Sequence, residues 1–506
     1  MDQIISTDYA SAAGSNTIYN RHRARWAFLL DSYMGGMQYQ NGSYLTRYQL
    51  ETEAEYAARL QITPLDNQVR SIIATYISFL FRVNPTRDLG SLESEITVGD
   101  FLKDCDWEGR DLDAFMKQAA IYANIFGHTW IVMSKPDVGA ITRADEIAAG
   151  VRPYLNMMTP LVVTDWKWTR KLNGSYELSY LKYVEDSNGS VSVIKEWTPT
   201  TVVTTTVNHE GETITDRLEE LNGLGRVPAV CLYAHTSSVR GLGLSTVNDI
   251  ADTQRLIYNL TSEAEQGIRL GSHPSLVATA DTNVGSGAGA LIHMPQNLDP
   301  ALKPYVLEFT GQEVSSVYTA ITNLVSSIDK MANTGSIRAT ESQVMSGVSR
   351  EVEFQLLNAR LSEQADNIEL AEEQLWKLFA EYQGQIWTGE IKYPDSFAVR
   401  DTDNELDQKL RAYGTVATPA FRTAIEHEIA ELLDLDLEET VVAELEAHPV
   451  TTVSDRSAHI QTMIMEGYTD AEILVIHAEI SQADITAAKQ DLLNLSNNGT
   501  NAADQD

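Results

Sequence analysis

The sequence has little cysteine, no long apolar run and no secretory pattern at its start, and each shortage argues against one class of protein. Among 506 residues only Cys105 and Cys231 are cysteines, far apart in the chain, which opposes a disulfide framework and is typical of two unpaired thiols in a reducing compartment. No apolar run reaches about 18 residues, so no membrane span is predicted. The N-terminus, Met1-Asp2-Gln3, lacks the basic-then-apolar layout of a secretory signal.

Positive charge is scarce. The chain holds 37 Lys and Arg against 71 Asp and Glu, a formal net charge of −34, and residues 401–506 hold 22 acidic and 5 basic side chains, a net charge of −17. Such a balance is typical of a solvated surface. It also argues against tight, sequence-independent DNA binding, which needs many cation–phosphate contacts. A protein past which DNA must slide would benefit from such weakly interacting walls.

Motifs that carry chemistry are missing. The string Gly285-Ser286-Gly287-Ala288-Gly289 lacks the Lys-Ser/Thr of a phosphate-binding loop. In Gly241-Leu242-Gly243-Leu244-Ser245 the serine lies outside the glycine pair, so the string is not a nucleophile elbow. His427-Glu428 continues to Glu431 and not to a second histidine, so the zinc-helix pattern fails. The sequence therefore predicts no enzyme, no catalytic residue, no cofactor and no metal.

Residues 20–244 combine helical and strand patterns. Spaced apolar residues predict helices over 20–33, 69–81 and 112–126, and an apolar strand over 129–133. Between 153 and 235 an antiparallel sheet region is predicted, with β-branched and aromatic segments at 178–184, 191–197, 200–207, 213–218 and 227–233. Arg21, Arg23 and Arg25 in the first helix form either a nucleic-acid patch or, more in keeping with their aromatic neighbours, an ordinary snorkelling face.

The block from Ser245 to Gln383 is the most informative part of the chain. Apolar spacing predicts helices over 245–269, with Ser245 as N-cap, and over 312–332, with a capping box at Thr310 and Glu313. Between them, residues 270–311 form a compact insert rich in glycine and proline, with short strands at 276–278 and 290–292. A polar loop, 333–347, then leads into a helix over 348–383, which would span about 50 Å.

The ends of the chain are simpler. Residues 1–19 are small and polar and predict a flexible arm. Residues 403–495 return to acidic helices, and 496–506 form a polar tail. The predicted fold class is therefore α+β, mainly helical.

The order of these elements resembles that of the portal (head-to-tail connector) proteins of tailed bacteriophages. The local likenesses are, in chain order, Ile121-Tyr122-Ala123-Asn124-Ile125-Phe126-Gly127, Trp130-Ile131-Val132, Gly287-Ala288-Gly289-Ala290-Leu291-Ile292-His293-Met294-Pro295, Ala339-Thr340-Glu341-Ser342 and Gly347-Val348-Ser349-Arg350. None of these strings is specific alone. Their order over roughly residues 20–490 carries the resemblance.

The resemblance implies a portal fold with wing, stem, clip and crown, assembled as a ring, commonly of twelve subunits, around a channel for double-stranded DNA. It makes 20–244 and 348–402 wing, 245–269 and 312–332 stem helices, 270–311 clip, 333–347 tunnel loop and 403–495 crown. The channel residues would be Lys330, Arg338, Glu341 and Gln343. The clip residues that dock other proteins would be Pro274, Gly287, His293 and Pro295.

The implied function is that of the channel at the unique capsid vertex through which the genome is packaged and ejected. The implied partners are the terminase large subunit, head-completion adaptor proteins, the major capsid protein and a scaffolding protein, with no membrane. The ring would assemble in the host cytoplasm and end in the virion. Two alternatives remain: a different ring-forming virion protein, such as an adaptor, although adaptors are usually shorter, and a soluble enzyme with an unrecognised site. For Lys330 and Arg338 the alternative to phosphate contact is ordinary salt bridging.

Overall fold

The computed structural model describes residues 15–136, 143–187, 191–208, 217–272, 275–280, 283–284, 292–293, 297, 299–307, 311–338 and 347–397, with scattered residues between 406 and 492. The chain divides into two compact units, Met1–Ala398 and Val399–Asp506. Each is described by itself. The predicted arm falls largely outside the described residues, but its upper bound is wrong, because Asn16 caps the first described helix and Tyr19 is buried.

Helices predominate in the described part of the chain up to residue 150. They are α2 (Thr17–Met34), α3 (Gly36–Asn41), α4 (Glu53–Ile62), α5 (Gln68–Leu80), a short 3-10 turn (Gly90–Leu92), α6 (Ile96–Lys103), α7 (Leu112–Phe126) and α8 (Arg143–Ala148). The Asp111 side chain caps α7 by accepting from the Ala114 N–H at 2.7 Å, and Gly127 ends α7 with φ +95°. A Cβ at Gly127 would lie 2.4 Å from the Gly243 carbonyl oxygen, so this crossing needs glycine.

Two antiparallel sheets follow where the sequence predicts one sheet region. The three-stranded sheet has the order β3-β2-β9, built from β2 (His128–Ser134), β3 (Tyr154–Met158) and β9 (Ala229–Tyr233). The five-stranded sheet has the order β4-β5-β6-β7-β8, built from β4 (Val163–Arg170), β5 (Tyr176–Ser187), β6 (Val191–Trp197), β7 (Thr201–Asn208) and β8 (Leu218–Leu221). Strands β3 and β4 were not predicted, and of the strand expected at 213–218 the first four positions lie outside the described residues, while β8 begins at Leu218.

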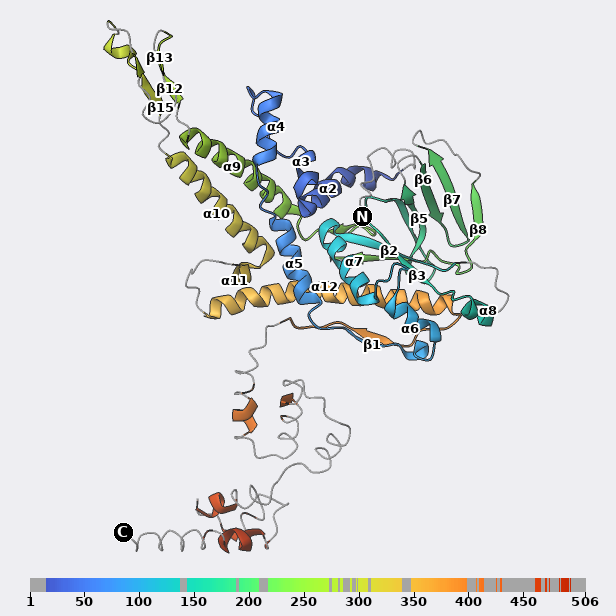
Figure 1. The fold of residues 1–506 in the computed structure, drawn as a ribbon. Helices are drawn as coiled ribbons and strands as arrows, with labels where there is room; N and C mark the ends of the chain where they lie inside the picture. Colours follow the sequence, from blue (N-terminus) through green and yellow to red (C-terminus); the bar gives the residue numbers. More distant parts are fainter. Residues whose placement is uncertain are drawn as a thin grey trace, which may run out of the picture. The chain divides into compact units, whose positions relative to one another are not determined.

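The remaining elements of the first unit form a helical hairpin and a long helix (Figure 1). They are β10 (His235–Thr236), β11 (Gly243–Leu244), α9 (Asn248–Ser272), α10 (Gln312–Ala332), α11 (Gly335–Arg338), α12 (Gly347–Tyr382) and β16 (Glu390–Lys392). Strand β16 pairs with the distant β1 (Thr86–Asp88), which the sequence pattern missed. The predicted long helix is confirmed, since α12 has 36 residues.

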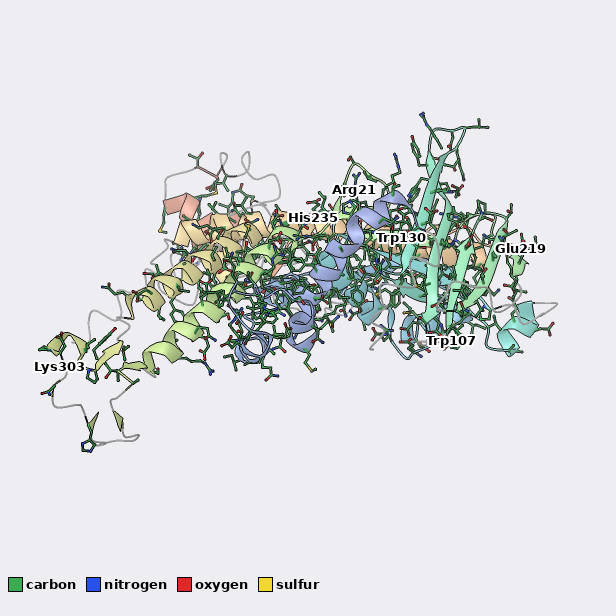
Figure 2. The ribbon with its side chains drawn as sticks, turned by 90° about the horizontal axis from the view of Figure 1, so that it is seen from above. Arg21, Trp107, Trp130, Glu219, His235 and Lys303 are labelled. Carbon is green, nitrogen blue, oxygen red and sulfur yellow. The ribbon has the colours of Figure 1, made fainter. Side chains whose placement is uncertain are left out.

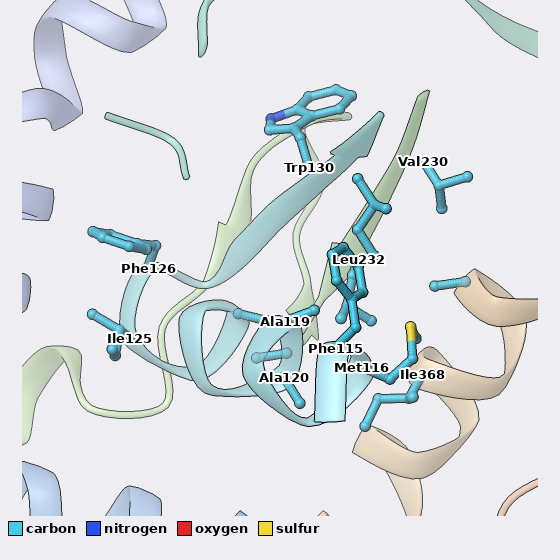
Figure 3. Packing of buried hydrophobic residues seen from close by; sticks show 14 of the residues in the cluster. Phe115, Met116, Ala119, Ala120, Ile125, Phe126, Trp130, Val230, Leu232 and Ile368 are labelled. Atoms are coloured by element: carbon cyan, nitrogen blue, oxygen red, sulfur yellow. The ribbon is translucent and has the colours of Figure 1, made fainter. Parts of the chain in front are cut away.

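The core of the first unit lies where α7, the three-stranded sheet and α12 meet. All seven residues of β2 are buried, as expected for a strand covered on both faces. Phe115 and Met116 of α7 pack in the same cluster as Leu232 of β9 and Ile368 of α12 (Figure 3). The long helix is therefore anchored in the core from Leu357 onward, where Leu357, Leu361, Leu375 and Phe379 are buried.

The second unit is described only at scattered residues. Among them Ile460, Met463, Ile473, Ile485 and Ala488 form a separate apolar cluster. Helical residues there include 460–465 and 484–490, in keeping with the predicted helices. The predicted polar tail lies outside the described residues. Helices together with antiparallel strands confirm the α+β prediction in its coarser form.

Candidate functional site

The block singled out by its sequence pattern folds into a helical hairpin, α9 and α10, with an insert at its free end (Figure 1). Helix α9 begins at Asn248 and not at Ser245. Instead of capping, the Ser245 hydroxyl donates to the Ile125 carbonyl at 2.7 Å and accepts from the Val247 N–H at 3.2 Å. The capping-box prediction is also wrong, because Gly311 is the N-cap of α10 and makes no side-chain cap bond.

The base of α9 is held by buried polar contacts. The Gln254 side chain is fully buried, accepts from the Val69 N–H of α5 at 2.8 Å and donates to the Ser32 carbonyl of α2 at 3.0 Å. Burying an amide is costly unless both its donor and its acceptor are paired, as they are here. Gln254 therefore fixes the orientation of α9 against two helices at once.

A forked ion pair adds to this anchor. The Arg25 guanidinium of α2 donates to both carboxylate oxygens of Asp252, at 3.0 and 2.8 Å, and to Asn248 Oδ1 at 2.9 Å. The hydrogen bonds and charge of Arg25 lower the pKa of Asp252, although partial burial opposes the shift. Arg25, one of the three arginines of the predicted basic patch, is thus engaged inside the molecule.

A second, more deeply buried ion pair braces α9 nearer its middle. Arg59 of α4 is 3% exposed and donates to both carboxylate oxygens of Glu51 at 2.7 Å. The same guanidinium donates to the Ser262 hydroxyl at 3.0 Å and stacks over Tyr48, 4.1 Å from the ring centroid. Helix α4 and the loop before it therefore support α9, the first helix of the hairpin.

The two helices of the hairpin approach closely at Gly267. A Cβ at this position would lie 2.8 Å from Cγ2 of Val314 on α10. Glycine inside a helix costs about 1 kcal/mol relative to alanine, so its presence is explained by this contact with α10. Towards the base, Ile328 and Ala332 of α10 are fully buried against the body.

The outward face of α10 carries no charge over most of its length. From Val314 to Ile328 the sequence has no acidic or basic residue, although the chain as a whole is strongly acidic. The exposed positions there are mainly hydroxyl and amide side chains: Ser315, Ser316, Tyr318, Thr319, Thr322, Asn323, Ser326 and Ser327. Three of the hydroxyls donate to the carbonyl four residues earlier, at 2.9 to 3.0 Å. This face is polar, neutral and hydrogen-bonded to itself.

The insert contains two short antiparallel ladders. Strand β12 (Ser275–Val277) pairs with β15 (Tyr305–Leu307), and β13 (Asn283–Val284) pairs with β14 (Ile292–His293). Of the predicted docking residues, His293 is described and is exposed on β14. Pro274, Gly287 and Pro295 lie outside the described residues. Lys303, exposed between a 3-10 turn (Pro300–Leu302) and β15, marks the insert in Figure 2.

The turn that follows α10 is closed by an ion pair. Asn333 ends the helix in the left-handed conformation, φ +54°, and α11 begins two residues later. Arg338 Nη1 lies 2.8 Å from Asp329 Oδ1, with both side chains about 15% exposed, and Arg338 Nη2 donates to the Gln68 side chain. In the described conformation Arg338 is therefore bound within its own chain. Its predicted role towards DNA is untested.

Lys330 differs from Arg338. It is exposed at the last turn of α10, and no carboxylate partner is found for it among the described residues. Its position suits the helix dipole, because a cation near the C-terminus is favourable. Glu341 and Gln343, the other predicted channel residues, lie outside the described residues, and the predicted loop 333–347 is partly helical because α11 occupies its start.

Two further contacts, which the sequence pattern did not reveal, tie this region to the body. Arg360 of α12 donates to the Met331 carbonyl at 3.0 Å and to the Tyr76 hydroxyl at 3.2 Å. Buried Gln364 donates to Asn124 Oδ1 at 3.0 Å, and Thr246 donates to the same oxygen at 2.6 Å. Asn124 lies within the string that resembles the portal family. These side chains join α5, α7, α10, α12 and the segment just before α9 from positions far apart in sequence.

Among the described residues, the titratable groups with shifted pKa values show no catalytic grouping. His128 is fully buried between Trp26, Trp130 and Tyr233, and burial lowers its pKa to about 3, so it stays neutral. Burial raises the pKa of the Cys105 thiol to about 12. Within the described residues, no cluster of three His, Cys, Asp or Glu side chains could hold a metal ion. None of the described helices combines the length and apolar character that a membrane crossing requires.

No protein-family model matches the sequence, and no curated protein matches it. Two of the solved structures to which this chain is similar come from gene transfer agent particles. One is described as the neck of an empty gene transfer agent (GTA) particle, computed with C6 symmetry, with 12% identity, a TM-score of 0.42, and coverage of 71% of this chain and 89% of that chain. The other is described as the virion of a native GTA particle, with 11% identity, a TM-score of 0.39 and the same coverage.

Proposed function

We propose that this protein is a portal subunit: a virion structural protein that assembles into a ring at one capsid vertex and conducts double-stranded DNA during packaging and ejection. One observation carries the proposal. A long two-helix hairpin presents a small insert at its free end, while its base is fixed in a helix-and-sheet body and leads into a 36-residue helix. The local strings that resemble the portal family occur in this same order.

The roles proposed for the hairpin, the insert and α10 follow from their contacts and exposure. The hairpin would be the stem, because Gln254 and Asp252 hold the base of α9 and Arg59 holds its middle. The insert would be the clip that docks the terminase and later the adaptors, because it is short and the described side chains of its strands, Val277, His293 and Tyr305, are exposed. The neutral face of α10 suits a wall that DNA passes, since it offers phosphates neither strong attraction nor strong repulsion.

Lys330 is our first candidate for a phosphate contact, since it is exposed and has no carboxylate partner among the described residues. Arg338 is the second, and it would have to leave Asp329 to reach DNA. The remaining proposed channel residues, Glu341 and Gln343, are assigned from the resemblance only. No metal, cofactor or catalytic step is part of this proposal.

The deciding experiment is to purify the full chain and record native mass spectra and electron-microscope class averages. The proposal expects a closed oligomer of about twelve copies with a central hole. A monomer or dimer at micromolar concentration would contradict it. Immunogold or cryo-electron microscopy of particles then separates a ring at the capsid vertex from an adaptor ring bound below it, because the proposal places this chain in the vertex itself.

A further inference from the structure

The two edges of the five-stranded sheet carry opposite charge. At one edge, all four residues of β8 are exposed, and two of them are Glu219 and Glu220 (Figure 2). No cation pairs with either carboxylate among the described residues. Arg217, immediately before β8, instead interacts electrostatically with Glu196 of β6. The β8 edge therefore presents two unneutralised carboxylates.

The other edge is basic. Lys167 of β4 is exposed, and its ammonium lies 5.1 Å from the centroid of the Tyr180 ring. Arg170 of β4 and Arg240 lie over the Tyr176 ring, at 6.0 and 3.7 Å from its centroid. No carboxylate pairs with these three cations in the part of the chain that the structure describes. These three cations gather at one edge of the sheet in a chain that has almost twice as many acidic as basic residues.

Both edges also expose apolar side chains. On β8, Leu218 and Leu221 are 55% and 88% exposed. At the other edge, Leu172 in the turn between β4 and β5 is fully exposed, and Tyr176 is 45% exposed. A sheet edge with exposed leucines is a liability unless something covers it. Each edge thus exposes apolar residues, and the two edges carry charges of opposite sign.

The sheet topology makes contact between unlike edges suitable for ring closure. Every neighbouring pair in the order β4-β5-β6-β7-β8 is antiparallel, so β4 and β8, at the two edges, run in the same direction. A copy rotated about a common axis can therefore bring its β8 edge to the β4 edge of the preceding copy. Such a contact is heterologous, with a different surface on each partner, and heterologous contacts generate closed rings when the rotation closes.

We propose that neighbouring copies of this chain dock edge to edge, with Glu219 and Glu220 of one copy facing Lys167, Arg170 and Arg240 of the next. The inference rests on the proposed ring function. Side chains make the contact and no continuous sheet is formed, because β4 has an extra residue, Thr164, between Val163 and Asp165, and the Thr164 carbonyl already accepts from the Asn16 N–H at 3.1 Å. The leucines of β8 pack on Leu172 and Tyr176, and the charges set the register and exclude like edges.

Charge reversal tests the inference directly. The acidic edge is reversed in Glu219→Lys/Glu220→Lys and the basic edge in Lys167→Glu/Arg170→Glu. Each variant places like charges in contact, and we expect the fraction of chains in rings to fall by about tenfold at a fixed concentration. The variant with all four changes again has opposite charges in contact and should recover most of that loss. The control Lys103→Glu/Lys117→Glu reverses two exposed cations of α6 and α7 and should assemble normally.

Ring fraction is measured by native mass spectrometry, and circular dichroism confirms that each variant is folded. Rings that form equally well in every two-residue variant, or a four-residue variant that fails to recover, overturn the edge contact while leaving the portal proposal intact. A wild-type chain that forms no ring defeats the proposed function itself. A loss that also appears in the control shows a general charge effect and overturns the specific contact.

Discussion

Arg87 Nε donates to Glu372 Oε1 at 2.5 Å, and this contact joins β1 to the middle of the long helix α12. Glu372 is fully buried. Its other oxygen accepts from the Tyr393 hydroxyl at 2.6 Å, and Oε1 also accepts from the Trp376 indole at 3.2 Å. A buried carboxylate is tolerated when every lone pair has a partner, as it has here. The pair fixes α12 against a strand nearly three hundred residues away.

Replacing that carboxylate should be costly. We expect Glu372→Gln to lower the free energy of unfolding by about 3 kcal/mol, because the largely buried Arg87 would keep only its second partner, Asp113. Urea unfolding of the purified chain measures the change. The matched control is the neighbouring Glu373→Gln, which breaks an exposed pair with Lys377 and should cost less than about 0.5 kcal/mol. Equal effects of the two changes would contradict the structural role of Glu372.

The close approach of α9 and α10 at Gly267 leads to a second prediction. Gly267→Leu should destabilise the hairpin by about 1–3 kcal/mol, since even its Cβ would meet Val314. Hydrogen exchange of α9 and α10 amides reports the loss locally. Gly267→Ala should be nearly neutral, because improved helix propensity offsets the crowding, and adding Val314→Ala to it should relieve the crowding. Faster exchange confined to other elements would count against this contact.

The buried His128 leads us to predict that the folded state loses stability in acid. Its pKa is lowered from the ordinary value near 6.5 to about 3 by burial. Below pH 6.5 the unfolded chain therefore binds a proton that the folded chain does not, so stability is lost as the pH falls towards 3. We expect His128 to contribute a loss of about 1 kcal/mol per pH unit between pH 6 and pH 4.

The variant that checks this pH dependence is His128→Gln, which does not titrate and keeps an acceptor for the Gly243 N–H. Its unfolding free energy should fall less steeply with acid than that of the wild type. The exposed His293→Gln serves as control and should keep the wild-type slope. Parallel slopes for all three proteins would show that His128 is protonated in the folded state or that carboxylates alone set the acid response.

Replacing Lys330 and replacing Arg338 should have different effects on DNA packaging and on stability. Lys330→Ala is expected to leave stability and ring assembly unchanged but to lower packaged DNA roughly twofold or more, since an exposed phosphate contact is lost. Arg338→Ala should lower packaging and also destabilise the turn by about 1–3 kcal/mol, because Asp329 would be left unpaired. DNA content of filled particles and urea unfolding provide the two measurements. Unchanged packaging in both variants would leave these residues with a structural role only.

Much of the fold could be predicted because its elements are marked locally. The apolar stripe and Gly127 fix α7, the repeated spacing fixes α12, and the β-branched run fixes β6. Prediction failed where tertiary contacts decided. The pattern near residue 245 suggested a helix start, but Ser245 hydrogen bonds to the end of α7 and the helix begins at Asn248. Strand β16 exists because β1 pairs with it.

The candidate site was predictable in outline and not in its contacts. Spacing of apolar and Gly/Pro residues located the hairpin, the insert and the turn, but a single arginine in a polar loop gives no sign of its partner. Only the fold shows that Arg338 meets Asp329, nine residues earlier, and Gln68 on α5. Likewise the sequence pattern puts Gln254 on the polar face of its helix. Only the packing shows that its side chain is buried and has a partner for both its donor and its acceptor.

The sequence by itself determined the acidic character, the absence of recognisable catalytic motifs and the order of helix, insert, helix, turn and long helix, because these depend on composition and on local periodicity. Tertiary structure alone decided which distant residues meet. It split one predicted sheet region into two sheets with β2 in the centre of the smaller one, and it placed Glu219 and Lys167 at opposite edges of the larger. Partners far apart in sequence leave no local signal, since contact depends on how the whole chain packs.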